Sequence, residues 1–308
     1  MLKRHQSTLD NFDQHITAEQ TITLKRRSII SEFAALSKMR LSLTVVFTSV
    51  LGLLIASKGN VNAVSLLLLS IGGFLITAAA NTINQVLEKD YDRLMSRTED
   101  RPLAAGRMKI SDAVLFAGIT CLIGTTILST FNPLTGVLGM ISFILYSFVY
   151  TPLKRYSPAA VAVGAVPGAL PVLIGCTAAQ GNLTWLAIGL FFIQFFWQFP
   201  HFWSIGYLGF DDYKKAGFKL IPEKNGGIDR SIAINGMFYI ALIIPVLYGL
   251  FRLSIIELPA LLVALLTTSA FMYVAHRFDK EFDRKSALRL MFFSFFYIPI
   301  LLISFLIF

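Results

Sequence analysis

The sequence has little charge for its length and almost no cysteine. Charged residues make up 15% of its 308 residues, whereas hydrophobic residues make up 55%. This composition leaves too little polar surface for a water-soluble globular protein of this size. The two cysteines, Cys121 and Cys176, lie in apolar stretches and lack the spacing of a disulfide framework or a zinc site. We therefore expect neither disulfide-stabilised folding nor redox or zinc chemistry.

Long apolar stretches separate the few charged residues. A helix needs about 20 residues to cross roughly 30 Å of hydrocarbon, and stretches of that length recur along the chain. A backbone exposed to lipid must satisfy its own hydrogen bonds, and these stretches lack the alternation of barrel strands. The sequence therefore predicts an all-α membrane protein. The nine predicted transmembrane helices lie near residues 41–57, 63–86, 112–130, 133–151, 159–178, 183–207, 232–251, 256–275 and 290–307.

Positive charge is concentrated on one side of this predicted topology. Of the 27 Lys and Arg residues, all but Lys58 and Arg252 fall before residue 41 or in alternate loops. The positive-inside rule thus explains the net charge of +9, so nucleic acid is not an expected partner. We expect a bacterial plasma-membrane protein with a cytoplasmic N-terminus, surrounded by membrane lipid. The matrix side of a mitochondrial inner membrane is the alternative location.

The first residues differ from the rest of the chain. Residues 1–35 mix acidic and basic side chains and lack the apolar core of a signal peptide. We expect them to form a mobile cytoplasmic tail. Residues 36–308 are expected to form a single transmembrane domain, because the predicted helices follow one another along this whole range.

A stripe of polar residues begins inside the second predicted helix. At about 100° per residue, Asn84, Gln85, Glu88 and Asp92 fall on one face of that helix. Polar side chains at the end of an apolar helix are costly unless they face a cavity or a partner. Carboxylate and amide oxygens are ligands that Mg²⁺ prefers, often together with substrate phosphates. The stripe therefore predicts a magnesium site.

Arginines follow this stripe closely. Arg97 and Arg101 carry guanidinium groups, which are always charged and can bind two phosphate oxygens at once. Arginines beside a metal-binding face indicate a diphosphate that is bound by the arginines and by the metal together. The alternative is a solvated loop with the usual excess of positive charge at this membrane face, and we favour it for the neighbouring Arg93 and Lys109.

The two patterns together carry a family resemblance. The segment Asn84-Gln85-x-x-Glu88-x-x-x-Asp92 is followed by Arg97-Thr98-x-x-Arg101-Pro102-Leu103. This succession resembles the first signature of the UbiA superfamily of intramembrane prenyltransferases. Gln85 and Glu88 stand where aspartates are more usual in that superfamily. Nine helices is also the number that this superfamily has.

Four further segments are similar to elements of the same superfamily. The last two of them resemble elements of its heme-modifying branch, and the resemblance covers the chain from about residue 36 to the C-terminus. The segments are Lys38-Met39-Arg40, Tyr150-Thr151-Pro152-Leu153-Lys154-Arg155, Trp197-Gln198-Phe199-Pro200-His201-Phe202-Trp203 and Asp211-Asp212-Tyr213-x-x-Ala216-Gly217.

The resemblance implies roles for individual residues. It implies that Mg²⁺ ions lie between two acidic motifs, and that Asp211 or Asp212 belongs to the second motif. An alternative for these two aspartates is that they are loop acids that balance Lys214 and Lys215. The implied catalytic residues are Asn84, Glu88, Asp92, Arg97, Arg101, Lys154 and Arg155; the first three and the two aspartates would hold metal. The implied substrate-binding residues are Lys38, Arg40, Gln85, Tyr150, His201 and Tyr213.

The resemblance also implies an activity. Enzymes of the heme-modifying branch transfer the farnesyl group of farnesyl diphosphate to a vinyl group of heme B, which gives heme O and diphosphate. Heme iron accepts imidazole, so we expect His201 to orient the heme. Heme B and farnesyl diphosphate are the expected substrates. A heme A synthase or assembly factors of a terminal oxidase are expected partners that receive the product.

Two alternatives remain for the function. The first keeps the chemistry but takes an aromatic quinone precursor as acceptor, and the His201 and Asp211-Asp212 segments argue against it. The second is a transporter or a heme-handling membrane protein. Transporters are typically built from two repeats with charges near the midplane, whereas here nine spans do not halve and the charges gather at one face.

Overall fold

The structure is a computed structural model that describes residues 28–308. The chain divides after Ala34 into two units, and the second, Ala35–Phe308, contains all the long helices. Most of the tail predicted for residues 1–35 lies outside the described residues. Its described end is helical, because helix α2 (Ile29–Leu36) begins there.

Helices account for nearly all of the second unit, which confirms the predicted all-α class. A small antiparallel hairpin, β1 (Glu223–Lys224) and β2 (Gly227–Ile228), pairs Glu223 with Ile228. The helices are α3 (Met39–Ala56), α4 (Ala63–Asp92), α5 (Ile110–Ser129), α6 (Pro133–Ile144), α7 (Thr151–Leu153), α8 (Ala160–Gln180), α9 (Trp185–Leu208), α10 (Phe210–Lys215), α11 (Ser231–Arg252), α12 (Leu258–Glu281) and α13 (Arg284–Ile307), with a π-helical turn, η1 (Leu145–Tyr150), between α6 and α7.

Eight helical stretches of the described chain are long and apolar enough to cross a membrane. The sixth predicted span coincides with α9, which has 24 residues but does not belong to these eight. Gln194, Gln198 and His201 lower its mean hydropathy, since all three are polar. The prediction of a multi-pass membrane protein is therefore confirmed, whereas a count of nine crossings is not.

Polar side chains fix where several helices begin. The side chains of Asn62 and Asn132 accept hydrogen bonds from the first turns of α4 and α6. Asp283 forms a capping box with Ser286 at the start of α13. Helix α4 continues beyond the predicted apolar span of residues 63–86 and ends at Asp92, so the whole polar stripe is helical, as its periodicity predicts.

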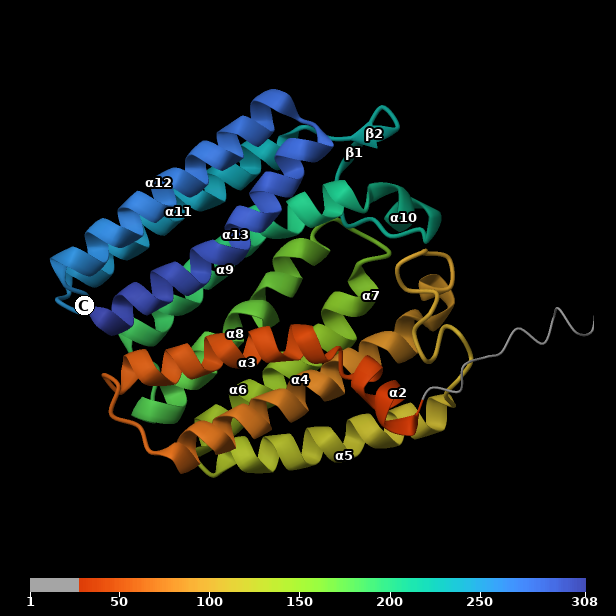
Figure 1. Ribbon diagram of the computed structural model, residues 1–308, viewed down its shortest axis with the longest axis horizontal. Helices are drawn as coiled ribbons and strands as arrows, with labels where there is room; N and C mark the ends of the chain where they lie inside the picture. Colours follow the sequence, from red (N-terminus) through yellow and green to blue (C-terminus); the bar gives the residue numbers. More distant parts are fainter. Residues whose placement is uncertain (1–27) are drawn as a thin grey trace, which may run out of the picture. The chain divides into compact units, whose positions relative to one another are not determined.

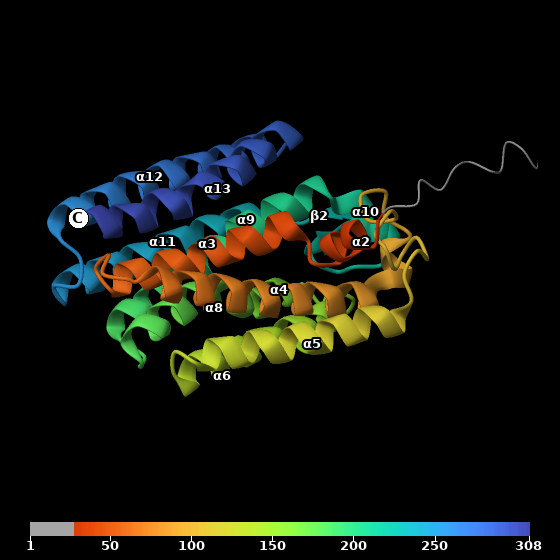
Figure 2. The ribbon, with the colours of Figure 1, turned by 60° about the horizontal axis from the view of Figure 1, so that its bottom comes forward.

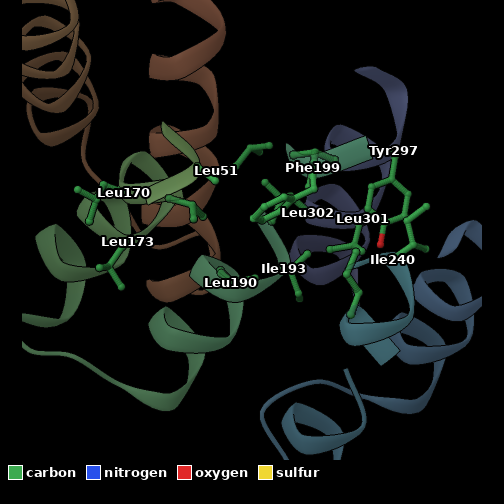
Figure 3. Close-up of a cluster of buried hydrophobic side chains, with 14 of the residues drawn as sticks. Leu51, Leu170, Leu173, Leu190, Ile193, Phe199, Ile240, Tyr297, Leu301 and Leu302 are labelled. Atoms are coloured by element: carbon green, nitrogen blue, oxygen red, sulfur yellow. The ribbon is translucent and has the colours of Figure 1, made fainter. Parts of the chain in front are cut away.

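The core lies where the helices of the second unit pack together. Helix α9 packs against α8, α11 and α13, and α3 packs against α8 and α4. Figure 3 shows buried side chains from several of these helices, among them Leu51, Leu170 and Ile193. Small residues allow close approach: a Cβ on Gly175 of α8 would lie 1.9 Å from the carbonyl oxygen of Ser49 in α3.

Three of the segments singled out from the sequence lie at one end of the helical bundle. The C-terminal end of α4, the loop that follows it and the short helix α10 lie at this end in both views, while the C-terminus lies at the other (Figures 1 and 2). The backbone amide of Lys219, after α10, donates a 2.7 Å hydrogen bond to the carbonyl of Lys154, after α7. Three loops thus meet at one end of the bundle.

Candidate active site

The polar stripe on α4 is buried. Asn84, Gln85, Glu88 and Asp92 are each at most 3% exposed. Buried polar groups must find partners, because an unpaired one loses its hydrogen bonds to water. The partners of these four side chains therefore determine what the site can do.

Glu88 pairs with a cation from a distant part of the chain. The Nζ atom of Lys154 lies 2.5 Å from Oε1 of Glu88, and both side chains are almost fully buried. The Asn84 amide donates to Oε2 of Glu88 at 2.8 Å and to the hydroxyl of Thr151 at 3.1 Å. Helix α4 is therefore joined by a hydrogen bond to the start of α7 and by an ion pair to the residue that follows α7.

Asp92 pairs with Arg101 from the following loop. Nη1 of Arg101 donates to both carboxylate oxygens of Asp92, at 2.8 and 2.7 Å. The loop folds back because the hydroxyl of Thr98 donates to the Asp92 carbonyl at 2.9 Å and the side chain of Met95 is buried. Both carboxylates of the stripe thus face a cation.

Lys38 adds a third cation. Its Nζ donates to Oδ1 of Asn84 at 2.8 Å, from a left-handed backbone position (φ 45°) directly before α3. Burial of the ammonium lowers the pKa of Lys38 well below its usual value, and the charges of Arg101 and Lys154 lower it further. Glu88 and Asp92 oppose this shift. Crowded positive charge is an arrangement that suits an anion.

The second acidic segment lies against the loop after α4. The Ser96 hydroxyl donates to Oδ2 of Asp212 at 3.1 Å. Nη2 of Arg97 donates to the Tyr213 hydroxyl at 2.9 Å, and its guanidinium lies 5.1 Å from the centre of the Tyr213 ring. Met95 packs with Ala216 and Phe218 beneath these contacts. The structure therefore brings this predicted pair of segments together.

Some predicted residues are used differently or lie apart. Arg155 donates to the Tyr91 hydroxyl at 2.9 Å rather than to the stripe. Gln85 donates to the Leu36 carbonyl at 2.8 Å, which anchors the chain before α3. Arg40 and Asp211 are exposed. Within residues 28–308, neither forms a hydrogen bond or an ion pair with the charged cluster, which consists of Lys38, Asn84, Glu88, Asp92, Arg101 and Lys154.

The acidic residues form a pair rather than a larger group. Between residues 28 and 308, no three side chains of His, Cys, Asp or Glu lie close enough together to hold a metal ion. Glu88 and Asp92 still offer carboxylate oxygens one helical turn apart, beside the amide oxygen of Asn84. Such hard oxygen donors match the preference of Mg²⁺, which keeps several waters and shares substrate phosphates.

A cavity of about 290 Å³ lies beside the charged cluster. It is walled mainly by apolar side chains of α3, α4, α8, α9 and α13 and by η1. Asn81 and Tyr150 line it next to the stripe, but Glu88 and Asp92 do not. The ring of Tyr150 lies 4.8 Å from Nζ of Lys154, so this tyrosine connects cavity and cluster.

Glycines of α8 shape the cavity wall. A Cβ on Gly164 would lie 2.6 Å from the Tyr150 ring, and one on Gly168 would lie 1.9 Å from Oε1 of Gln198. Side chains at either position would displace a residue that lines the cavity.

His201 also lines this cavity, from α9. The residue is 6% exposed, and its ring stacks on Trp197 with ring centres 4.8 Å apart. Nδ1 lies 2.7 Å from the hydroxyl oxygen of Ser294 in α13. Sequence reasoning assigned no role to Ser294 or Thr151, because a hydroxyl residue beside or within an apolar helix has no distinctive spacing.

The chain is similar to known proteins along most of its length. Residues 45–297 match the UbiA prenyltransferase family. A protoheme IX farnesyltransferase of Cytophaga hutchinsonii is 41% identical over 89% of this chain and 97% of its own length. One of Christiangramia forsetii is 42% identical over 89% of this chain and 92% of its own length.

A solved structure shares the fold. It is that of a UbiA homolog from Archaeoglobus fulgidus bound to GPP and Mg²⁺, with a TM-score of 0.65 and 14% sequence identity. The match covers 89% of this chain and 99% of the homolog's chain. Both the family pattern and the close relatives span most of the sequence. The chain therefore belongs to the UbiA prenyltransferase family.

Proposed function

We propose that this prenyltransferase moves the farnesyl group of farnesyl diphosphate to a vinyl group of heme B. One observation carries the proposal: a buried cluster of carboxylates and cations borders an apolar cavity whose lining includes a histidine. The apolar walls of this cavity suit an isoprenoid chain or the face of a porphyrin, and the cluster suits a diphosphate. The relatives that are about 40% identical carry the name of this activity.

Mg²⁺ fits the donor set at the cluster. Asn84, Glu88 and Asp92 would hold it, and the homolog from Archaeoglobus fulgidus is described as bound to GPP and Mg²⁺. Asp212 is a better candidate than Asp211 for a second ion, because it contacts the loop after α4. When bound, Mg²⁺ would neutralise negative charge on the departing diphosphate.

The cations of the cluster would hold the diphosphate. Lys38, Arg101 and Lys154 now contact Asn84, Asp92 and Glu88, so diphosphate oxygens would take over part of these contacts. Arg97 and Arg155 donate hydrogen bonds to Tyr213 and Tyr91, respectively, beside the cluster. They would add further positive charge near the diphosphate. Charge placed beforehand where negative charge develops lowers the barrier to ionisation.

Ionisation breaks the bond between the first farnesyl carbon and the diphosphate oxygen, and the electron pair leaves with diphosphate. The vinyl group of heme B then donates its π electrons to the allylic cation and forms the new carbon–carbon bond. Water adds to the resulting cation beside the porphyrin and loses a proton, which completes the hydroxyethylfarnesyl chain. Tyr150 lines the cavity beside the cluster, where its ring can face the allylic cation.

The remaining proposals concern the surroundings. We place the N-terminus on the cytoplasmic side of a bacterial inner membrane. The reason is that most Lys and Arg residues lie before the first predicted span or in the loops on the same side of the membrane. Residues 36–308 would form the catalytic domain. A heme A synthase or a terminal oxidase assembly factor would receive the product, since heme O is a precursor for such proteins to use.

A direct assay tests the function. Purified protein is incubated with heme B, farnesyl diphosphate and Mg²⁺, and both diphosphate release and the mass of the heme are measured. Glu88→Gln should abolish product, whereas Asp90→Asn should not, because the Asp90 side chain is 65% exposed and lies on another helix face. Diphosphate release with a quinone precursor but not with heme B would indicate the other acceptor. Absence of any diphosphate release would refute a prenyltransferase.

A further inference from the structure

Ser294 in α13 makes two separate contacts with α9. It is fully buried, and its backbone carbonyl accepts a 2.8 Å hydrogen bond from the Trp197 indole. Its hydroxyl oxygen lies 2.7 Å from Nδ1 of His201. The same hydroxyl lies 2.6 Å from the Met291 carbonyl, one turn earlier in α13. The hydroxyl therefore stands between a carbonyl oxygen and a ring nitrogen.

Counting protons fixes the direction of both hydrogen bonds. Each of the two short contacts needs one proton, the serine hydroxyl has one, and a carbonyl has none. If the hydroxyl donated to His201, two oxygen atoms would face each other at 2.6 Å without a proton between them. The arrangement with a proton in each contact has Ser294 donating to Met291 and Nδ1–H of His201 donating to Ser294. A neutral imidazole then keeps its lone pair on Nε2.

The imidazole ring is held on more than one side. Trp197 stacks on it with an angle of 17° between the planes, and Phe295 meets it edge-on with ring centres 4.9 Å apart. Nδ1 is engaged by α13, while His201 itself lines the cavity. Among the residues that the structure describes, no Asp or Glu lines the cavity to pair with a charged imidazolium.

We propose that Ser294 is a positioning residue that fixes His201 as the Nδ1–H form, so that Nε2 binds the iron of heme B in the cavity. The proposal rests on the proposed function, because it takes heme B as the ligand. Histidines that bind metals almost always donate their other ring N–H to a neighbouring acceptor, which orients the ring and raises its basicity. Ser294 occupies the position of such an acceptor.

Titration of the purified full-length protein with ferric heme B tests this role. Ser294→Ala should weaken heme binding about tenfold, the size of effect that follows loss of such a partner. The absorption spectrum of bound heme should also move away from that of heme mixed with imidazole in the same detergent. Ser294→Thr keeps a hydroxyl at this position and should retain the wild-type spectrum. Affinity for farnesyl diphosphate should be unchanged in both variants.

Ser304→Ala is a matched control. Ser304 is also buried in α13, and its hydroxyl donates to the Leu301 carbonyl at 2.7 Å, but it does not line the cavity. This variant should bind heme as the wild type does, and its melting temperature provides the reference for Ser294→Ala.

The outcomes distinguish the role of Ser294 from the proposed function. If the wild type binds and farnesylates heme but Ser294→Ala has the same heme affinity and spectrum, the role of Ser294 is refuted and the function stands. Equal losses of heme and farnesyl diphosphate affinity would also refute it, because they indicate a general packing defect. If wild-type protein neither binds nor modifies heme B, the proposed function itself fails.

Discussion

Replacement of Lys154 by methionine should destabilise the protein by about 3 kcal/mol. Methionine fills a similar volume, but it leaves the Glu88 carboxylate without its cation in a place where the side chain is 4% exposed. Removal of one partner from a buried ion pair costs roughly 3–5 kcal/mol, since the remaining charge is uncompensated. We expect a cost at the lower end of this range, because Asn84 still donates a hydrogen bond to the Glu88 carboxylate.

The double variant Lys154→Met, Glu88→Gln should regain most of this loss. It removes both charges, and replacement of a whole buried ion pair by neutral groups is often close to neutral in stability. Unfolding free energies measured by denaturant titration in detergent micelles would give all four corners of the mutant cycle.

Lys214→Met is the matched control. Lys214 pairs with Glu223 at 3.6 Å, and the two side chains are 50% and 38% exposed. Such exposed pairs contribute about 0–1 kcal/mol. Two results would contradict this prediction. One is that Lys154→Met lowers the free energy of unfolding no more than Lys214→Met does. The other is that the double variant is no more stable than Lys154→Met.

Three further predictions concern catalysis, the cavity and the start of α13. Arg101→Lys should lower kcat/KM about tenfold, because an ammonium replaces the planar guanidinium beside Asp92; steady-state kinetics with unchanged activity would argue against a diphosphate contact. Gly168→Ala should cost about 1–3 kcal/mol of stability and lower turnover, since the new methyl displaces Gln198; melting curves and product yield measure both effects. Hydrogen bonds from the first turn of α13 hold the pKa of Asp283 below its usual value, so its stabilising effect is present at neutral pH and is lost as pH falls through that lowered pKa. The melting temperature of Asp283→Ala should therefore lie below that of the wild type at pH 7, and the gap should narrow in acid.

The sequence predicted local features of the site well. The spacing of Asn84, Glu88 and Asp92 placed them on one helical face, and the structure finds this face buried and helical to its end. Periodicity is a property of neighbouring residues, so it is readable without tertiary information. Hydropathy marks only the apolar part of this helix, residues 63–86, whereas the periodicity of the polar residues follows it to its end at Asp92.

Partners across the bundle were not readable in this way. Glu88 meets Lys154, 66 positions later, because α4 packs beside η1 and α7. Such a contact depends on helix packing rather than on local pattern. The difference between Lys38 and Arg40 has a similar cause: a left-handed turn at Lys38 directs it to Asn84, while Arg40 is exposed on α3.

The backbone at Lys38 has a consequence for substitution at this position. Left-handed conformations cost a residue with a side chain roughly 1–2 kcal/mol, and glycine adopts them without this cost. A glycine here would thus relax the chain just before the first long helix, but it would remove the ammonium that contacts Asn84. At this residue, the side chain that contacts Asn84 and the backbone conformation of lowest energy therefore favour different amino acids. A library of variants at position 38 that is scored for thermal stability alone would therefore select proteins that lack the contact between Lys38 and Asn84.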